Sequence, residues 1–96
     1  MHLTTDEIKK LLKNWHFYRM LVSTSGNDME LKRKLDAVER SLVVLDDVSR
    51  TIIQARYFDK TEMNVVVEKA FMARSAVYKR IDKALAEMSY VIANTA

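Results

Sequence analysis

Two short breaks divide residues 52–85 into three segments in which apolar side chains recur at helical spacing. The breaks fall at residues 59–61 and 71–73. The last segment begins with Arg74 and carries further cations on the sides turned away from its apolar stripe. The three segments are expected to be helices, and a tight turn separates the second from the third, which is basic. This is the layout of a helix-turn-helix, whose second helix lies in the major groove of DNA. The remaining residues are expected to support this unit.

The composition favours helices in the rest of the chain as well. The 96 residues include one glycine and no proline, whereas strands and their turns usually need more of both. Nearly half of the residues are apolar, which is enough for a small core within one domain. We predict an all-α fold of four to five helices, in which a helical hairpin over residues 1–45 precedes a helix-turn-helix unit over residues 46–96. Any oligomerisation is expected at the hairpin.

A capping signal marks the start of the first helix. Thr4, with Glu7 three residues later, matches a capping box. The apolar spacing that follows predicts one unbroken helix to Val22. Polar residues over 23–28, which include the glycine, predict a loop after it.

The second helix is expected to start at a cap formed by Asn27 or Asp28. Leucine and valine residues at alternating spacings of four and three form a seam over residues 29–45, as in helices that pack side by side. Asp46-Asp47 allows two interpretations. Either this pair caps a new helix, or one long helix continues through it into the next segment.

Three helices are expected in the carboxyl-terminal half. The first covers residues 47–58 and turns Val48 and Ile52 inward. The second begins after Thr61, which is its expected cap, and the third covers residues 74–92. The inner stripe of the third helix comprises Val77, Ile81, Ala84, Met88 and Ile92.

Many of these positions also match the pattern of a known family. The matching residues are Arg56-Tyr57-Phe58, Val66, Val67, Glu68, Met72, Arg74-Ser75, Val77-Tyr78, Arg80 and Lys83-Ala84-Leu85. This half of the chain resembles region 4 of the sigma-70-type sigma factors, and more closely the small phage late-gene transcriptional regulators of the ArpU and RinA type. The resemblance implies sequence-specific binding to double-stranded DNA and regulation of late genes in a phage or prophage, either as an activator or as a repressor. It also allows contact with RNA polymerase and implies a cytoplasmic location in a bacterial host cell. It also favours a helix boundary near Leu45.

Two residues depart from the family's pattern at the tight turn. Phe71 stands where a glycine is usual, and Ala73 stands where a hydroxyl residue usually caps the recognition helix. Glycine tolerates positive φ, and alanine in place of a serine cap costs about 1 kcal/mol. The angle between the two helices is therefore expected to differ from the family's, or the cap to shift to Ser75.

The candidate DNA-binding residues all lie on the last helix. They are Arg74, Ser75, Ala76, Tyr78, Lys79, Arg80 and Lys83. Arg74, at the helix start, suits guanine O6 and N7, and Ser75 with the first backbone amides suits a phosphate. Ala76 suits a thymine methyl group, and Lys79 lies farther along the same side. The other three flank Lys79 and suit phosphate oxygens, which position a protein on DNA without reading its sequence.

The charge distribution supports this assignment more than the net charge does. The chain carries 16 basic and 13 acidic residues, a surplus of +3. Residues 74–83 contain four cations and one anion, Asp82, so the net charge of this segment, +3, equals the net charge of the whole chain. Clustering of cations on one helix is expected of a DNA-reading helix, and Asp82 marks where contact with phosphates would end.

Several functions are excluded by the residue types present. The absence of cysteine excludes disulfides, a thiolate nucleophile and a cysteine-based zinc site. His2 and His16 do not have metal-ligand spacing, and no Ser-His-Asp arrangement or glycine-rich phosphate loop occurs, so we expect no enzyme, cofactor, metal or small-molecule substrate. Trp15, Phe17 and Tyr18 are expected in the core rather than as a platform for stacked bases. Because no apolar run resembles a signal peptide or a membrane span, a soluble cytoplasmic protein is expected.

Two other functions and the oligomeric state remain open. The leucine seam and the broad apolar surface of the first helix either complete the core or support a homodimer that reads two half-sites. A phage packaging adaptor of the small-terminase kind also joins a helix-turn-helix to an oligomerising part. A protein-interaction module, such as a sigma-like decoy or anti-activator, would keep the fold without DNA contacts, and Phe71, Ala73 and Asp82 favour it.

Overall fold

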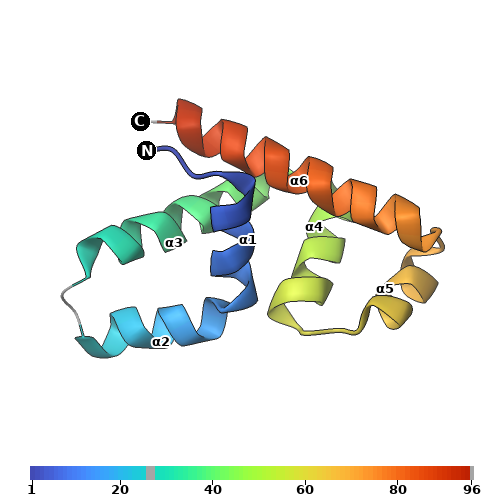
Figure 1. The fold of residues 1–96 in the computed structure, drawn as a ribbon, viewed down its shortest axis with the longest axis horizontal. Helices are drawn as coiled ribbons and strands as arrows, with labels where there is room; N and C mark the ends of the chain where they lie inside the picture. Colours follow the sequence, from blue (N-terminus) through green and yellow to red (C-terminus); the bar gives the residue numbers. More distant parts are fainter. Residues whose placement is uncertain (26–27, 96) are drawn as a thin grey trace.

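A computed structural model describes residues 1–25 and 28–95 of the protein (Figure 1). These residues form helices joined by short loops and contain no β-strand, which confirms the predicted all-α class. The described residues contain six α-helices instead of four to five: α1 (Thr5–Lys13), α2 (Trp15–Ser25), α3 (Met29–Ser41), α4 (Asp47–Ile53), α5 (Met63–Ala70) and α6 (Arg74–Asn94). A 3-10 turn, Leu42–Val44, follows α3, and a π-helical turn, Gln54–Phe58, extends α4.

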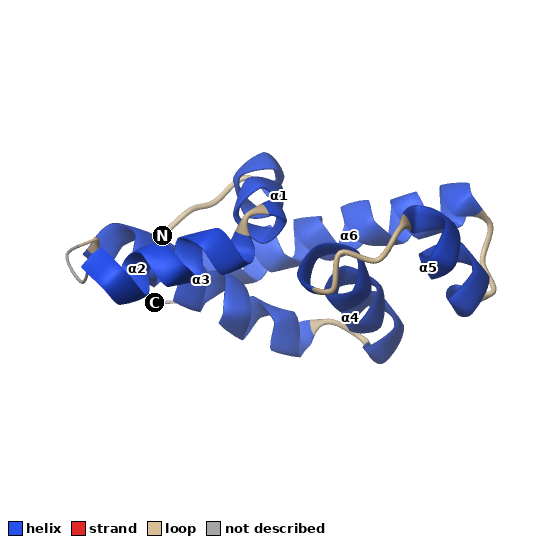
Figure 2. Cartoon of the chain, turned by 90° about the horizontal axis from the view of Figure 1, so that it is seen from below, coloured by secondary structure: helices blue, strands red, loops and turns tan. Residues whose placement is uncertain are grey.

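The longest helix, α6, joins the two ends of the molecule. It runs along the long axis and packs against α1, α3, α4 and α5, with the α2–α3 pair towards one end and α5 towards the other (Figures 1 and 2). The amino-terminal segment lies beside the end of α6, where the Ser89 hydroxyl donates to the carbonyl of Leu3 at 2.5 Å. One continuous core underlies all of these contacts. Its fully buried side chains include Ile8, Leu12, Leu35, Val38, Ile53, Val77 and Met88.

The first helix starts as predicted but does not continue to Val22. The capping box is confirmed, because the Glu7 N–H donates to Thr4 Oγ1 at 3.1 Å and the Thr4 N–H donates to the Glu7 carboxylate at 3.3 Å. The prediction of one unbroken helix is wrong, since α1 ends at Lys13 and its C-cap residue, Asn14, has φ −118° and ψ 29°. The Lys60 ammonium group donates to the carbonyl of Lys13 at 2.5 Å and so satisfies an oxygen at the exposed helix end.

Aspartate caps set the starts of α3 and α4. Asp28 accepts the N–H of Leu31 at 2.9 Å, and Asp46 accepts the N–H of Ser49 at 2.7 Å. The boundary near Leu45 is therefore confirmed, and the alternative of one long helix is wrong. The predicted loop over residues 23–28 begins later than expected, because α2 extends through Ser25; the alternative cap at position 27 lies outside the described residues.

Val48 does not point inward, contrary to the sequence prediction. Its side chain is 48% exposed, whereas Ser49, Ile52 and Ile53 form the buried face of α4. The prediction carried the phase of the preceding leucine seam across Asp46. Because the chain leaves the helix there and starts a new one, the rotation of α4 is independent of the seam, and its inward face shifts.

Thr61 does not cap α5, which is a second correction. The N-cap residue is Glu62, one position later. The backbone N–H of Thr61 instead donates to the carbonyl of Ala55 at 2.8 Å, and its carbonyl accepts the Arg56 guanidinium at 3.3 Å. Both bonds hold Thr61 in the turn that closes the preceding π-helical segment, so α5 begins beyond it.

The predicted tight turn between the last two helices is confirmed over residues 71–73. Phe71 adopts a left-handed backbone conformation, with φ 55° and ψ 39°, and its side chain is 95% exposed. The Met72 N–H donates to the carbonyl of Val67 at 3.4 Å, which closes the end of α5. The position therefore has the backbone geometry of a glycine while carrying a phenylalanine.

Phe71→Gly is expected to raise the free energy of unfolding by about 1 kcal/mol. A non-glycine residue in the left-handed region costs about 1–2 kcal/mol, and part of the gain is offset because glycine is more flexible in the unfolded chain. The ring contributes little packing to the fold, because it is exposed. Urea unfolding followed by circular dichroism measures the change. Phe71→Ala, which removes the ring but keeps Cβ, is the control and should lie within about 0.5 kcal/mol of the native protein; destabilisation by Phe71→Gly would contradict the strain argument.

Candidate nucleic-acid interface

The candidate interface is built on the first three turns of α6. Val77, Ile81 and Ala84 are buried and fix one side of this helix against the core. The residues at intervening positions must then point outward, because a helix turns by 100° per residue. Ala73, the N-cap residue, has an extended backbone but a methyl side chain that cannot accept an amide hydrogen, so the first amides of α6 keep their capacity to donate.

The structure divides the seven sequence-predicted residues into three groups. Ser75, Lys79 and Lys83 are exposed on the outward side of α6. Tyr78 is exposed on one flank, and Ala76 is half-buried on the other. Arg74 and Arg80, the two arginines, are each held by another side chain of the protein.

The two arginines bind groups outside α6. The Arg74 guanidinium donates to the side-chain carbonyl of Asn64, in the first turn of α5. The Arg80 guanidinium lies 3.5 Å from the carboxylate of Asp46, which caps α4. The hydrogen bond from the Ser49 backbone lowers the pKa of Asp46 below its ordinary value, and the charges of Arg80 and Lys83 act in the same direction. The Asp46 carboxylate is therefore charged at neutral pH, and it competes with any external phosphate for Arg80.

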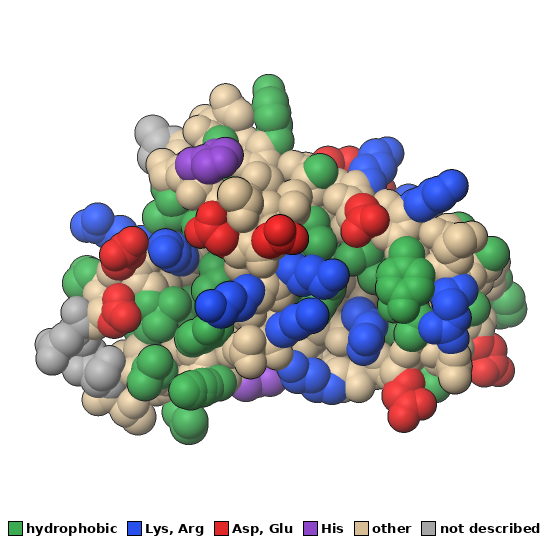
Figure 3. All heavy atoms as spheres, in the orientation of Figure 1, with side chains coloured by type: hydrophobic (Ala, Val, Ile, Leu, Met, Phe, Trp, Pro, Cys, Tyr) green, Lys and Arg blue, Asp and Glu red, His purple; other side chains and the backbone are tan. Residues whose placement is uncertain are grey.

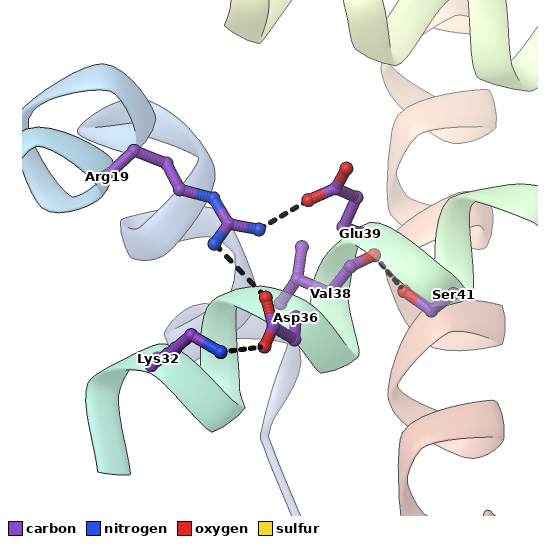
Figure 4. A network of polar contacts seen from close by, with 6 residues as sticks. All are labelled: Arg19, Lys32, Asp36, Val38, Glu39 and Ser41. Atoms are coloured by element: carbon purple, nitrogen blue, oxygen red, sulfur yellow. Dashed lines mark hydrogen bonds and ion pairs between the residues drawn. The ribbon is translucent and has the colours of Figure 1, made fainter. Parts of the chain in front are cut away.

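A second polar network fixes α2 on α3, away from α6 (Figure 4). Arg19 on α2 donates to Asp36, at 3.1 Å, and to Glu39, both on α3, while Lys32 lies 3.5 Å from the other oxygen of Asp36. Partial burial acts to raise the pKa of Asp36, but the hydrogen bond from Arg19 and the charges of Lys32 and Arg19 outweigh it, so that this pKa lies below its ordinary value. The same guanidinium lies 5.0 Å from the centre of the Trp15 ring.

The aromatic residues of α2 are only partly in the core. Trp15 is buried and meets the edge of Phe58 with ring centroids 5.3 Å apart, as expected of a core residue. Phe17 is exposed, contrary to the prediction, together with Met20 and Leu21 on the same side of the helix. Figure 3 shows hydrophobic side chains gathered over α2 at the lower left. Since Arg19 is turned towards α3, this outward side of α2 carries little charge.

Sequence reasoning missed a group of basic residues on and beside α1. Figure 3 shows Lys and Arg side chains in a band across the middle of the molecule, below α6 and over the region of α1. Lys9, Lys10 and Lys13 are spaced for one side of a helix, and that spacing is visible in the sequence. Their proximity to Lys60 is a tertiary contact, which no local pattern indicates.

No group of three or more histidine, aspartate or glutamate side chains within residues 1–25 and 28–95 is arranged to hold a metal ion. In the same part of the chain, no helix has the length and apolar character needed to cross a membrane. No family model, curated protein or solved structure matches the chain.

Proposed function

We propose that the protein is a transcription regulator that binds double-stranded DNA, with the outward side of α6 in the major groove. The free charge on that side is the observation that carries the proposal. Lys79 and Lys83 are exposed, and no carboxylate of the described residues lies within 4 Å of either ammonium group. Such lysines suit phosphate oxygens at the edge of a groove and the acceptor groups of base pairs within it.

The connection before α6 supports the proposal. An eight-residue helix, α5, a three-residue turn over 71–73 and a longer basic helix follow one another, and α4 packs against both helices. This is the arrangement through which helix-turn-helix proteins hold a recognition helix and expose its amino-terminal half. The core side chains of α6 fix its rotation, so the outward lysines are presented by a supported helix.

A narrower proposal concerns the biological setting. We propose activation of late genes in a phage or prophage, with contact to RNA polymerase and a cytoplasmic location in the bacterial host. This part rests on the resemblance of the carboxyl-terminal half to late-gene regulators of the ArpU and RinA type.

Replacement of Lys79 and Lys83 by alanine tests the proposal directly. The native protein is mixed with a fragment library from the surrounding genome at two salt concentrations, and it should select a defined sequence with an affinity that falls as salt rises. If each lysine neutralises one phosphate, the double variant should make the slope of log K against log salt shallower by about 1.8. Arg33→Ala with Arg40→Ala on α3 removes the same charge from exposed residues and should change the slope little. A folded native protein that binds no fragment at low salt would exclude the proposal.

Arg74→Ala in the same selection separates base reading from backbone contact. If Arg74 leaves Asn64 to bind a guanine, its loss should relax the preference at one base pair, at a cost of about 1–3 kcal/mol. If the Arg74→Ala variant keeps the sequence preference of the native protein, the role of Arg74 is structural, through its hydrogen bond between α6 and Asn64 on α5.

The engagement of both arginines favours one alternative, a protein-interaction module. Arg74 is held by Asn64 and Arg80 by Asp46, which leaves two of the four cations of residues 74–83 without a side-chain partner. A sigma-like decoy or anti-activator would retain its activity in a folded Lys79→Ala, Arg74→Ala variant. Loss of activity in that variant would exclude the alternative.

The uncharged outward side of α2 supports self-association, for which we propose a homodimer. Phe17, Met20 and Leu21 are exposed at helical spacing on this side. Two copies can bring such surfaces together without opposing like charges. Sedimentation of the protein with its selected duplex gives the stoichiometry, and a ring of many subunits would favour a packaging adaptor over a dimeric regulator.

A further inference from the structure

Arg74, the first residue of α6, is joined to the neighbouring helix by its side chain. Its guanidinium group donates a hydrogen bond to the side-chain carbonyl of Asn64, the second residue of α5. The two helices pack against each other at this end of the molecule (Figure 1). Both side chains are exposed, so the bond lies at the surface and not in the core. Its main effect is therefore on the direction of the Arg74 side chain.

The rotation of α6 turns Arg74 towards α5. Arg74 precedes Val77 by three residues and Ile81 by seven, a spacing that places all three on one side of a helix. Val77 and Ile81 are buried, whereas Arg74 is exposed, because it lies in the first turn before the first buried residue of the helix. A long side chain in this place can adopt many conformations. The bond to Asn64 selects those in which the guanidinium lies beside the start of α5.

The partner of Arg74 is neutral, unlike the partner of the other arginine in the same segment. Arg80 lies 3.5 Å from the carboxylate of Asp46, which offsets its charge. Within residues 1–25 and 28–95, no carboxylate lies within 4 Å of the Arg74 guanidinium. The amide of Asn64 therefore orients Arg74 without cancelling its positive charge.

Most of the hydrogen-bonding capacity of Arg74 is left unused as well. A guanidinium group carries several N–H donors in a planar fork, and the bond to Asn64 takes one of them. The described part of the chain offers the Arg74 side chain no further hydrogen bond or ion pair. One edge of the fork can therefore still bind guanine O6 and N7, the commonest specific contact of arginine with a base pair. Arg74 does not have to leave Asn64 to make that contact.

We propose that Asn64 is a positioning residue, which holds Arg74 in the direction that base reading needs. The inference rests on the proposed function, because Asn64 acts through a residue of the recognition helix, whose amino-terminal residues contact base edges. A side chain that is ordered before binding loses less conformational entropy when it binds. The gain applies to the base pair that Arg74 contacts, so Asn64 raises the sequence preference there and not the affinity for every duplex.

The variant Asn64→Ala tests the inference. Alanine has a higher helix propensity than asparagine and position 64 is exposed, so α5 should survive, which a thermal melt verifies. The base pair that Arg74 reads is the one at which Arg74→Ala relaxes the preference. For the selected duplex over one changed at that base pair, Asn64→Ala should lower the ratio of affinities by about 2- to 10-fold, the cost of ordering one long side chain.

Two further variants of α5 serve as controls. Asn64→Gln keeps a carbonyl acceptor one methylene group farther out, so it should restore part of the preference that Asn64→Ala loses. Val65→Ala truncates the neighbouring residue, which is uncharged and 37% exposed, and should leave the preference unchanged.

The double variant Asn64→Ala, Arg74→Ala separates positioning from direct contact. Once Arg74 is absent, Asn64→Ala should have no further effect on the preference at that base pair, because the two residues act as one unit. A further loss in the double variant would mean that Asn64 itself contacts the duplex, and it would overturn the inference.

Other results would overturn it in different ways. A stronger preference in Asn64→Ala would show that Asn64 holds Arg74 away from the duplex. An equal loss of affinity for every duplex would make the role of Asn64 purely structural. If the native protein selects a sequence through Lys79 and Lys83 but neither Arg74→Ala nor Asn64→Ala changes the preference, the inference fails and the proposed function stands. If the folded native protein binds no duplex at low salt, both fail.

Discussion

Met88→Ala should lower the free energy of unfolding by about 3 kcal/mol. Met88 has an exposed fraction of 0% and lies on the buried side of α6, in the part of the helix that follows the proposed recognition turns. Truncation of a buried methionine to alanine removes apolar area from the core and leaves a cavity that the packed helices cannot fully close, at a cost of about 2–5 kcal/mol. Chemical unfolding of the purified protein, followed by far-ultraviolet circular dichroism, measures the change.

Tyr90→Ala is the matched control for Met88→Ala. Tyr90 lies two residues later on the same helix but is 70% exposed, so its removal should change stability by less than about 0.5 kcal/mol. Equal effects of the two substitutions would mean that the last turns of α6 do not pack on α1 and α3 as described.

Arg50→Met should destabilise the protein by about 2 kcal/mol, the second largest effect we expect. The Arg50 guanidinium donates to the carbonyl of Leu42 at 3.2 Å, of Val43 at 3.2 Å and of Leu45 at 2.7 Å. It thereby satisfies the last carbonyl groups of the 3-10 turn and fixes α4 against the end of α3. A hydrogen bond from a charged donor contributes about 1.5–3 kcal/mol when buried, and partial exposure of these bonds reduces their sum.

Methionine is chosen because it keeps the apolar stem of Arg50 while removing every donor. Arg50→Lys should fall between the native protein and Arg50→Met, since an ammonium group cannot reach three carbonyls in the planar arrangement of a guanidinium. Arg33→Met, at an exposed arginine on α3, controls for the loss of charge. An Arg50→Met variant as stable as this control would show that the carbonyls are equally well satisfied by water.

Sequence reasoning succeeded where the determinant of structure is local. The capping box of Thr4 and Glu7 and the aspartate cap at Asp46 involve residues three positions apart, so both can be read from a short window. The turn over 71–73 follows from the end of one apolar stripe and the start of another. Its left-handed residue was indicated only through the resemblance, because nothing in the sequence around Phe71 marks that conformation.

Sequence reasoning failed where a distant group acts on a helix end or where the helical phase restarts. At the end of α1, the Lys13 carbonyl accepts a hydrogen bond from Lys60, which lies far along the chain. Val48 was placed inward by extending a periodicity across a helix break. Within the candidate site, the residues of α6 follow from charge and spacing. Their partners Asn64 and Asp46 do not, since each belongs to a different helix and is brought close only by folding.

The contact between Leu3 and Ser89 has a consequence for how the chain folds during synthesis. Of the described helices, α1 is synthesised first and its packing partner α6 last. Part of the apolar side of α1 therefore stays without its packing partner until α6 has been synthesised. Contacts of this sequence separation slow folding, because a long loop must close before they form. The packing of α1 on α6 is thus expected to form late in folding.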